Sequence, residues 1–270
     1  MFNIWLVMKI TFKEGIRSRI LFGISLLALF LFASNIFITN LFAFELGKVM
    51  VDIAFSSLSI AGLSIIFFLG IGLLSRDIHQ KTVYMIISRP ITRVQYTIGK
   101  FGGLALILLT AMGILGLLAV VSFFVCSNLV AGAELPRNFS WLHVLTAIFF
   151  NFLSLLVVMS FAFFFTVISS SIYLAMLFSF AVYLIGHSLE TIVKIIERGD
   201  FINTGPLFVY VMKIISWVFP NLSAFDIKAG VAYGLPVDPV CLFWTAVYGC
   251  TYTALMIMFT CMVFHRKDVC

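Results

Sequence analysis

The sequence predicts an all-α protein that crosses a membrane six times. Of its 270 residues, 63% are hydrophobic and only 10% are charged, whereas soluble domains average about 45–50% apolar and about 25% charged residues. The apolar residues form continuous runs of about 20 residues, the length that a helix needs to span a bilayer. Strands of a membrane barrel would instead alternate apolar and polar residues. Because backbone polar groups must be paired internally in lipid, these runs predict transmembrane helices.

Residues 1–19 are amphipathic and precede the first span. Lys9, Lys13 and Arg17 recur every four residues, so they share one face of a helix. This pattern is typical of a helix that lies in the membrane interface. The following apolar run, 20–42, is longer than the core of a signal peptide and has no convincing small-residue cleavage site. We therefore expect an uncleaved first span.

The other apolar runs predict five further spans within a single membrane domain, 1–270. In chain order the six spans are 20–42, 53–74, 96–126, 141–168, 172–189 and 240–264. A basic connection, 76–95, separates the second and third spans, and a long segment, 190–239, separates the last two. The apolar stretch 207–219 inside that segment is too short to span and contains Lys213. It predicts either a re-entrant or an interfacial helix.

The distribution of charge favours a topology with both termini in the cytoplasm. With six spans, 11 of the 17 Lys and Arg residues but only three of the 11 acidic residues lie on the cytoplasmic side. Cytoplasmic loops of membrane proteins carry such an excess of Lys and Arg. A seventh span would place Arg266 and Lys267 outside, against this rule. The net charge of +6 therefore reflects topology and does not indicate binding of nucleic acid.

The sequence contains no motif for nucleotide or metal binding. Neither G-x-x-x-x-G-K-[ST] nor H-E-x-x-H occurs, and the spans lack the ionisable pairs that ion-coupled carriers place inside the membrane. His187 and Glu190 share a helical face at a span end, where a polar interfacial pair is the simpler interpretation. Cys126 and Cys241 both fall near the outer face, so a disulfide between them stays open. We predict no catalytic, cofactor or metal site, and hence no enzyme.

The basic connection 76–95 has the features of a docking element. Residues 77–87 have helical spacing, and Pro90 ends the helix because the residue before a proline avoids the α region. Charge alone is explained by a loop that rests on anionic lipid. The proline break and the aromatic Tyr84 and Tyr96 favour a helix that docks a cytoplasmic protein. The residues that we expect to make this contact are Asp77, His79, Lys81, Thr82, Tyr84, Arg89, Pro90 and Arg93.

Several segments resemble the permeases of ABC-2 type transporters. The connection reads acidic-x-x-x-Lys-Thr, then Ser-Arg-Pro-Ile-Thr-Arg and Tyr-x-x-Gly-Lys, and is similar to the family's loop between the second and third spans. Residues 219–226 (FPNLSAFD) are similar to its Pro-Asn-Leu-x-x-Phe-Asp segment, and residues 264–268 (FHRKD) to its basic tail. The amphipathic N-terminus matches its elbow helix. The chain departs from the family pattern at Asp77, where Glu is commoner, and at Lys81, where Gly is common.

The resemblance implies a permease subunit of the bacterial inner (plasma) membrane. Such a subunit pairs with a second permease copy, which predicts a homodimer, and with two copies of a cytoplasmic ABC ATPase that binds ATP and Mg²⁺. The coupling helix, from residue 77 to 87, would lie in a groove of the ATPase, and segment 190–239 would cap the pathway. An extracytoplasmic or additional membrane partner is compatible with this arrangement. The alternative is a non-transporting membrane scaffold, which the scarcity of polar groups along the spans favours.

Overall fold

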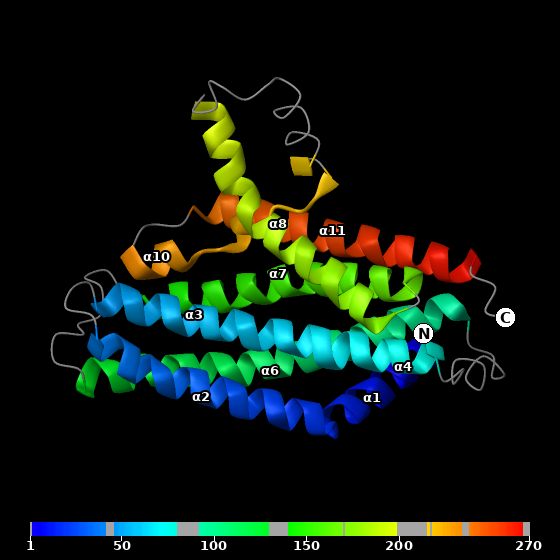
Figure 1. Cartoon of the computed structure of the whole chain (residues 1–270), viewed down its shortest axis with the longest axis horizontal. Helices are drawn as coiled ribbons and strands as arrows, with labels where there is room; N and C mark the ends of the chain where they lie inside the picture. Colours follow the sequence, from blue (N-terminus) through cyan, green and yellow to red (C-terminus); the bar gives the residue numbers. More distant parts are fainter. Residues whose placement is uncertain are drawn as a thin grey trace.

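The computed structural model describes residues 2–41, 46–79, 92–129, 140–169, 171–198, 215–216, 218–233 and 238–266. Every regular element within these residues is a helix (Figure 1). Five helices in the described part are long and apolar enough to cross a membrane, or six if one bent pair of helices is counted as a span. The chain is therefore a polytopic helical membrane protein, as its composition predicts.

The first two helices meet at a sharp bend. Helix α1 (Phe2–Ile16) carries the row of cations, and α2 (Arg19–Leu41) is almost entirely apolar. Their axes differ in direction by 58°. At the turn between them, the Ser18 hydroxyl accepts a hydrogen bond from the backbone N–H of Ile20 at 3.2 Å, which satisfies a donor at the start of α2. The charged helix and the apolar helix thus run in different directions.

The next span is longer than predicted and changes its helical geometry midway. It consists of α3 (Leu46–Ser64), the π-helix η1 (Ile65–Ile71) and α4 (Gly72–His79). The prediction placed this span at 53–74, followed by a separate coupling helix that began at residue 77. Instead, residues 77–79 continue the spanning helix, since no proline or glycine interrupts the chain between Gly72 and His79.

Four long helices complete the described bundle. They are α6 (Arg93–Leu129), α7 (Trp141–Ile168), α8 (Ile172–Arg198) and α11 (Pro239–Arg266). Between α8 and α11 lie a short 3₁₀ turn, η2 (Ser223–Phe225), and α10 (Lys228–Tyr233). Helix α8 runs beyond the end predicted at residue 189. The expected re-entrant or interfacial stretch, 207–219, lies mostly outside the described residues. Cys241 is a free and exposed thiol.

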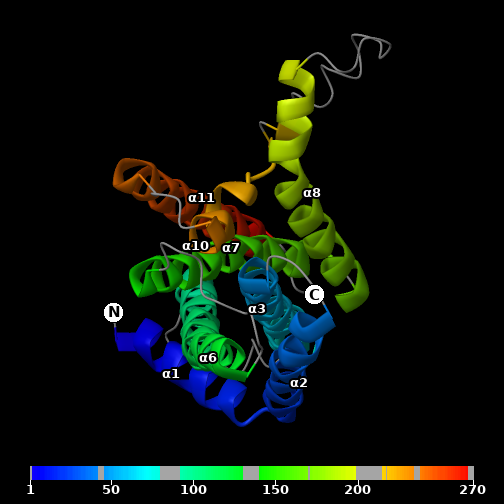
Figure 2. The ribbon, with the colours of Figure 1, turned by 90° about the vertical axis from the view of Figure 1, so that its left-hand side faces the viewer.

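Helix α7 occupies the centre of the bundle. Seen end on, it lies between the pair α3 and α6 on one side and the pair α8 and α11 on the other, while α1 and α2 cover the far side of α6 and α3 (Figure 2). Most of its residues between Phe150 and Val167 are buried. By contrast, many large apolar side chains of α2 and α11 are exposed, among them Phe30 and Trp244. Such faces suit contact with lipid.

Candidate functional site

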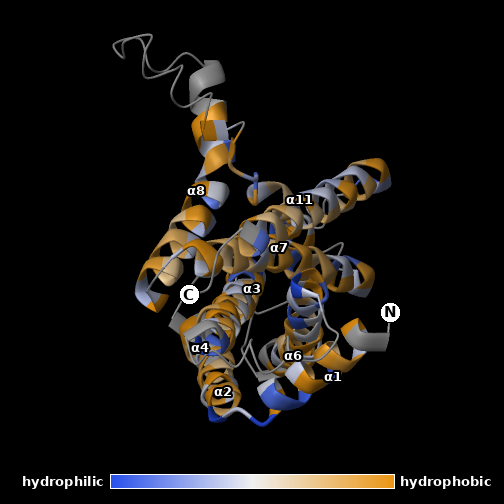
Figure 3. Cartoon of the chain, turned by 90° about the vertical axis from the view of Figure 1, so that its right-hand side faces the viewer, coloured by the Kyte–Doolittle hydropathy of each residue, from blue (hydrophilic) through white to orange (hydrophobic). Residues whose placement is uncertain are grey.

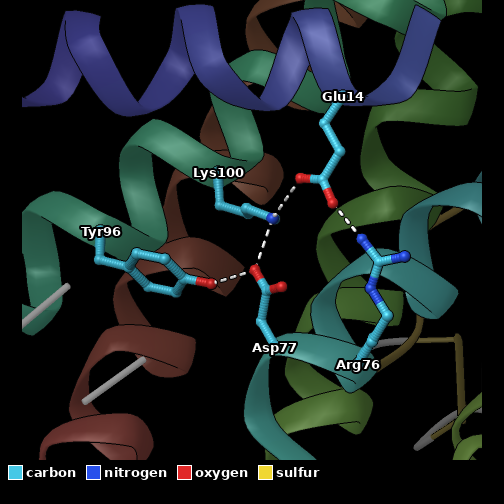
Figure 4. Close-up of polar contacts among 5 residues, drawn as sticks. All are labelled: Glu14, Arg76, Asp77, Tyr96 and Lys100. Carbon is cyan, nitrogen blue, oxygen red and sulfur yellow. Dashed lines mark hydrogen bonds and ion pairs between the residues drawn. The ribbon is translucent and has the colours of Figure 1, made fainter. Parts of the chain in front are cut away.

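A cluster of four charged residues and one tyrosine joins three helices at one end of the bundle. We call this end, where α4 and α11 finish and α6 begins, the basic end; it also carries α1 (Figure 1). The five residues of the cluster are Glu14, Arg76, Asp77, Tyr96 and Lys100 (Figure 4). Two carboxylates face two cations, so the charges of the cluster balance.

Asp77 is the centre of the cluster. It lies in the last turns of α4 and is only 9% exposed. Its Oδ2 atom accepts a hydrogen bond from the Tyr96 hydroxyl at 2.6 Å and forms an ion pair with the Lys100 Nζ atom at 2.5 Å (Figure 4). Tyr96 and Lys100 are four residues apart on α6, so both side chains project from one face. Because a buried carboxylate needs such partners, these contacts fix α4 against α6.

Glu14 extends the cluster to α1. One carboxylate oxygen lies 3.5 Å from the Lys100 Nζ atom, and the other forms an ion pair with the Arg76 guanidinium (Figure 4). Lys100 is 4% exposed, whereas Glu14 and Arg76 are partly open to solvent. Lys100 therefore bridges two carboxylates that come from different helices, and the three helices are tied together through its ammonium group.

Glycines of α6 allow α1 to approach closely enough for these contacts. A Cβ atom on Gly99 would lie 2.8 Å from the Val7 Cβ atom, and one on Gly103 would lie 2.6 Å from the Thr11 Cβ atom. Carbon atoms do not approach this closely, so larger residues would separate the helices. These small residues therefore serve packing within the chain.

Arg93 links the start of α6 to the end of α11. Its guanidinium donates hydrogen bonds to the backbone carbonyls of Phe264, at 3.2 Å, and His265, at 3.4 Å. A cation at this position is favourable because the last carbonyls of a helix carry partial negative charge. The rings of Tyr96 and Phe264 also stack, with centroids 6.5 Å apart. The start of α6 and the end of α11, which are distant in the sequence, thus lie side by side.

The structure describes three of the eight residues predicted to dock a partner. Asp77 and Arg93 lie just before and just after residues 80–91, and both contact other helices. His79 is the last residue of α4. The other five lie outside the described residues: Lys81, Thr82, Tyr84, Arg89 and Pro90. A docking role for all eight stays a prediction.

Sequence reasoning missed the partners of Asp77. The spacing of Tyr96 and Lys100 indicates a shared helical face, and Lys100 is a cation at the start of an apolar run. Both observations point to an acidic partner for Lys100. Glu14 is the only acidic residue among the cations of residues 1–19, but nothing local identifies Arg76 as its partner, 62 residues away.

At the opposite end of the bundle, the segment 219–226 is seated between α8 and α11. The Leu222 N–H donates to the Gly186 carbonyl at 3.0 Å, and the Ser223 hydroxyl donates to the His187 carbonyl at 2.7 Å. The Asn221 N–H donates to the Tyr248 hydroxyl at 2.9 Å. Through these bonds, the segment that resembles the family's Pro-Asn-Leu motif joins two spans.

A small polar cavity lies beneath this segment. Its volume is about 20 Å³, which is enough for one water molecule. The Asn151 amide nitrogen is buried there without a hydrogen-bond partner, while the amide oxygen accepts from Ser59 at 3.3 Å. His187 and Asp226 also line the cavity. A bound water would satisfy the unpaired amide group, so we assign the cavity a structural role.

No protein-family model and no curated protein sequence matches this chain.

Proposed function

We propose that this chain is the membrane-spanning permease subunit of an ABC-2 type transporter, driven by a separate ATPase that docks on the cytoplasmic connection 76–95. The observation that carries the proposal is the anchoring of this connection at both ends. Near its start Asp77 binds Lys100 and Tyr96, and near its end Arg93 binds the end of α11. The order of the family-like segments in the sequence supports the same assignment.

Anchoring at both ends suits a connection that transmits force. A partner that moves residues 80–91 would pull on α4 through Asp77, and the bonded Lys100 would pass this movement to α6 and α1. Arg93 would pass it to α11. The π-helix η1 lies in the same span as Asp77, and π-helical turns are frequent at functional sites. ATP and Mg²⁺ would bind to the partner ATPase, of which we expect two copies.

The polar groups of the spans suggest where the cargo passes. Many hydroxyls donate to a carbonyl of their own helix, as Ser160 does to Val157 and Thr166 to Ala162, each at 2.6 Å. Hydroxyls bonded in this way offer little to a hydrophilic cargo. A pathway between two permease copies, for a lipidic or amphipathic cargo, is consistent with this arrangement. We place the basic end on the cytoplasmic side of a bacterial inner membrane, because cytoplasmic loops carry an excess of Lys and Arg.

The same hydroxyl pattern supports a second candidate function. A membrane scaffold that anchors other proteins needs no polar pathway, and hydroxyls bonded within their own helices would suit its spans equally well. The two functions differ in energy use. A permease stimulates the ATPase activity of its partner when cargo is present, and a scaffold does not. Measuring partner ATPase activity in liposomes with and without candidate lipids separates them.

Association with an ATPase tests the proposal directly. The chain is purified in mild detergent from its native host, and the proteins that accompany it are identified by mass spectrometry. We expect an ABC ATPase, and we expect Arg89→Glu to weaken its association at least about tenfold, the loss that corresponds to about 1.4 kcal/mol. Arg89 is a better site for this charge reversal than Arg93, because Arg93 also binds the end of α11.

The matched control is Lys13→Glu, an equal charge reversal on an exposed residue of α1. It should leave the ATPase bound. If no ATPase accompanies the wild-type chain, or if both reversals weaken association equally, the docking assignment is wrong.

A further inference from the structure

An apolar cavity opens beside the bend between α1 and α2. Its volume is about 200 Å³. The bend contributes Ile16, Leu21 and Ile24, the π-helix contributes Ile65, and α6 contributes residues between Ile107 and Leu115. The cavity thus lies where the charged helix, the first apolar helix, the π-helix and α6 meet.

The walls of the cavity suit a hydrocarbon chain. Two hydroxyls reach it, and both are already bonded within their own helices: Ser25 donates to the Leu21 carbonyl and Thr110 to the Ile107 carbonyl, each at 2.9 Å. No polar group in the wall therefore requires a polar ligand. A cavity of ~150 Å³ with similar walls stays dry and binds benzene, so 200 Å³ accommodates a short hydrocarbon segment.

The orientation of the cavity matches that of a lipid tail. From Ile107 to Leu115, α6 rises by about 12 Å at 1.5 Å per residue. The α1–α2 bend lies beside the Ile107 end, since a Cβ atom on Gly15 would lie against the Ile107 side chain. The cavity therefore starts at the depth of the bend and extends along the apolar part of the bundle.

Positively charged residues lie at the bend that borders the cavity. Arg17 and Arg19 flank the bend, and both residues are exposed. Hydrophilic residues gather at this bend, directly beside the hydrophobic surface of α2 (Figure 3). The nearby carboxylate of Glu14 is engaged with Arg76 and Lys100. Guanidinium groups bind phosphate oxygens well, often through two parallel hydrogen bonds.

We propose that an anionic glycerophospholipid occupies this cavity, with one acyl chain between α2, η1 and α6 and its phosphate on Arg17 and Arg19. Charge complementarity favours this occupant over a second copy of the chain, because a protein contact here would cover two arginines that need acidic partners. The lipid would fill the space between the bent helix pair and the π-helix, so that the membrane itself completes the packing of the bundle.

Native mass spectrometry of the full-length chain tests this proposal. The detergent-solubilised protein is offered equal amounts of dioleoyl-phosphatidylglycerol, which is anionic, and dioleoyl-phosphatidylcholine, which is neutral overall. We expect the wild type to retain the anionic lipid preferentially, and removal of each arginine, by Arg17→Gln or Arg19→Gln, to lower that preference about fivefold. Ala111→Phe, which places a ring in the cavity wall, should lower retention of both lipids.

Two variants control for charge and for bulk. Lys9→Gln with Lys13→Gln removes two exposed cations of α1, and Gly113→Phe adds a ring to α6 where a Cβ atom meets nothing within 4 Å. Both should retain phosphatidylglycerol as the wild type does. Equal retention of the two lipids by the wild type, or loss of the preference in the lysine variant to the same extent, would overturn the proposal.

A measurement on the wild type avoids dependence on the folding of variants. Phosphatidylglycerol with a photoactivatable group in its acyl chain is cross-linked to the protein, and the labelled peptides are mapped. The proposal expects label on residues 21–25 and 107–115. Label spread evenly over the exposed faces of α8 and α11 would show that no lipid binds specifically in the cavity, and the proposal would be wrong.

Discussion

The carboxylate of Asp77 lies 2.5 Å from the ammonium group of Lys100, between the end of one spanning helix and the beginning of the next. Both residues are more than nine-tenths buried. They lie on either side of residues 80–91, so the ion pair joins the two helices from which this connection departs. We expect this ion pair to contribute to the stability of the protein and to transmit movement of residues 80–91 to α4 and α6.

Removing one partner of this pair should destabilise the protein strongly. Lys100→Met leaves the Asp77 carboxylate buried without its cation, and the expected cost is about 3 kcal/mol in the free energy of unfolding. Asp77→Leu combined with Lys100→Met removes both charges and should recover most of the loss. The free energy of unfolding is measured by denaturant titration in detergent micelles, with Asp52→Asn, which neutralises an exposed acid, as the control. A single variant as stable as the wild type would show that the pair contributes little.

The hydroxyl of Tyr96 should contribute separately from its ring. Tyr96→Phe keeps the stacking on Phe264 but removes the hydrogen bond to Asp77, at an expected cost of about 1.5–3 kcal/mol because the acceptor is charged. Tyr173→Phe is the matched control, since Tyr173 is 82% exposed. Equal unfolding free energies for the two variants would mean that the hydrogen bond from Tyr96 to Asp77 in the folded state contributes no more than the bonds that this hydroxyl makes to water in the unfolded state.

The packing of α1 on α6 should depend on glycine. Gly103→Ala places a methyl group where Thr11 now lies, so we expect a loss of about 1–3 kcal/mol. Gly113→Ala on the same helix faces open space and should be neutral or stabilise by up to about 1 kcal/mol, because alanine favours the helix. Thermal unfolding in detergent compares the two variants. Similar melting temperatures for both would contradict a close contact between α1 and α6.

The sequence predicts the helices well because their apolar character is local. Five of the predicted spans correspond to helical stretches in the described residues that are long and apolar enough to cross a membrane, and the first corresponds to α2, which qualifies only together with α1. The fourth, 141–168, has the same bounds as α7. The ends of the other helices differ, because polar residues such as Asp77 remain helical when a neighbouring helix supplies their partners. A pattern of single residues does not reveal such partners.

The π-helix and the charged cluster depend on relationships that lie outside any local pattern. Residues 65–71 read as an ordinary apolar run, and their wider turns arise where the span packs against α7 and α2. Glu14 and Arg76 meet only because glycines at 99 and 103 let α1 lie close to α6. The sequence shows the apolar run, the charged residues and the glycines separately, but the π-helical geometry and the contacts among these residues belong to the folded structure.

ATP turnover by the proposed complex of this chain with an ABC ATPase tests the central claim most directly. The comparison is between the wild type and the double variant Asp77→Leu with Lys100→Met, which lacks the polar anchor but should keep most of its stability. If movement of residues 80–91 passes through this anchor, the ATPase stays bound while cargo-stimulated turnover falls at least about tenfold, equivalent to about 1.4 kcal/mol in activation free energy. Unchanged stimulation by cargo in the double variant would contradict the claim that Asp77 and Lys100 couple the two subunits.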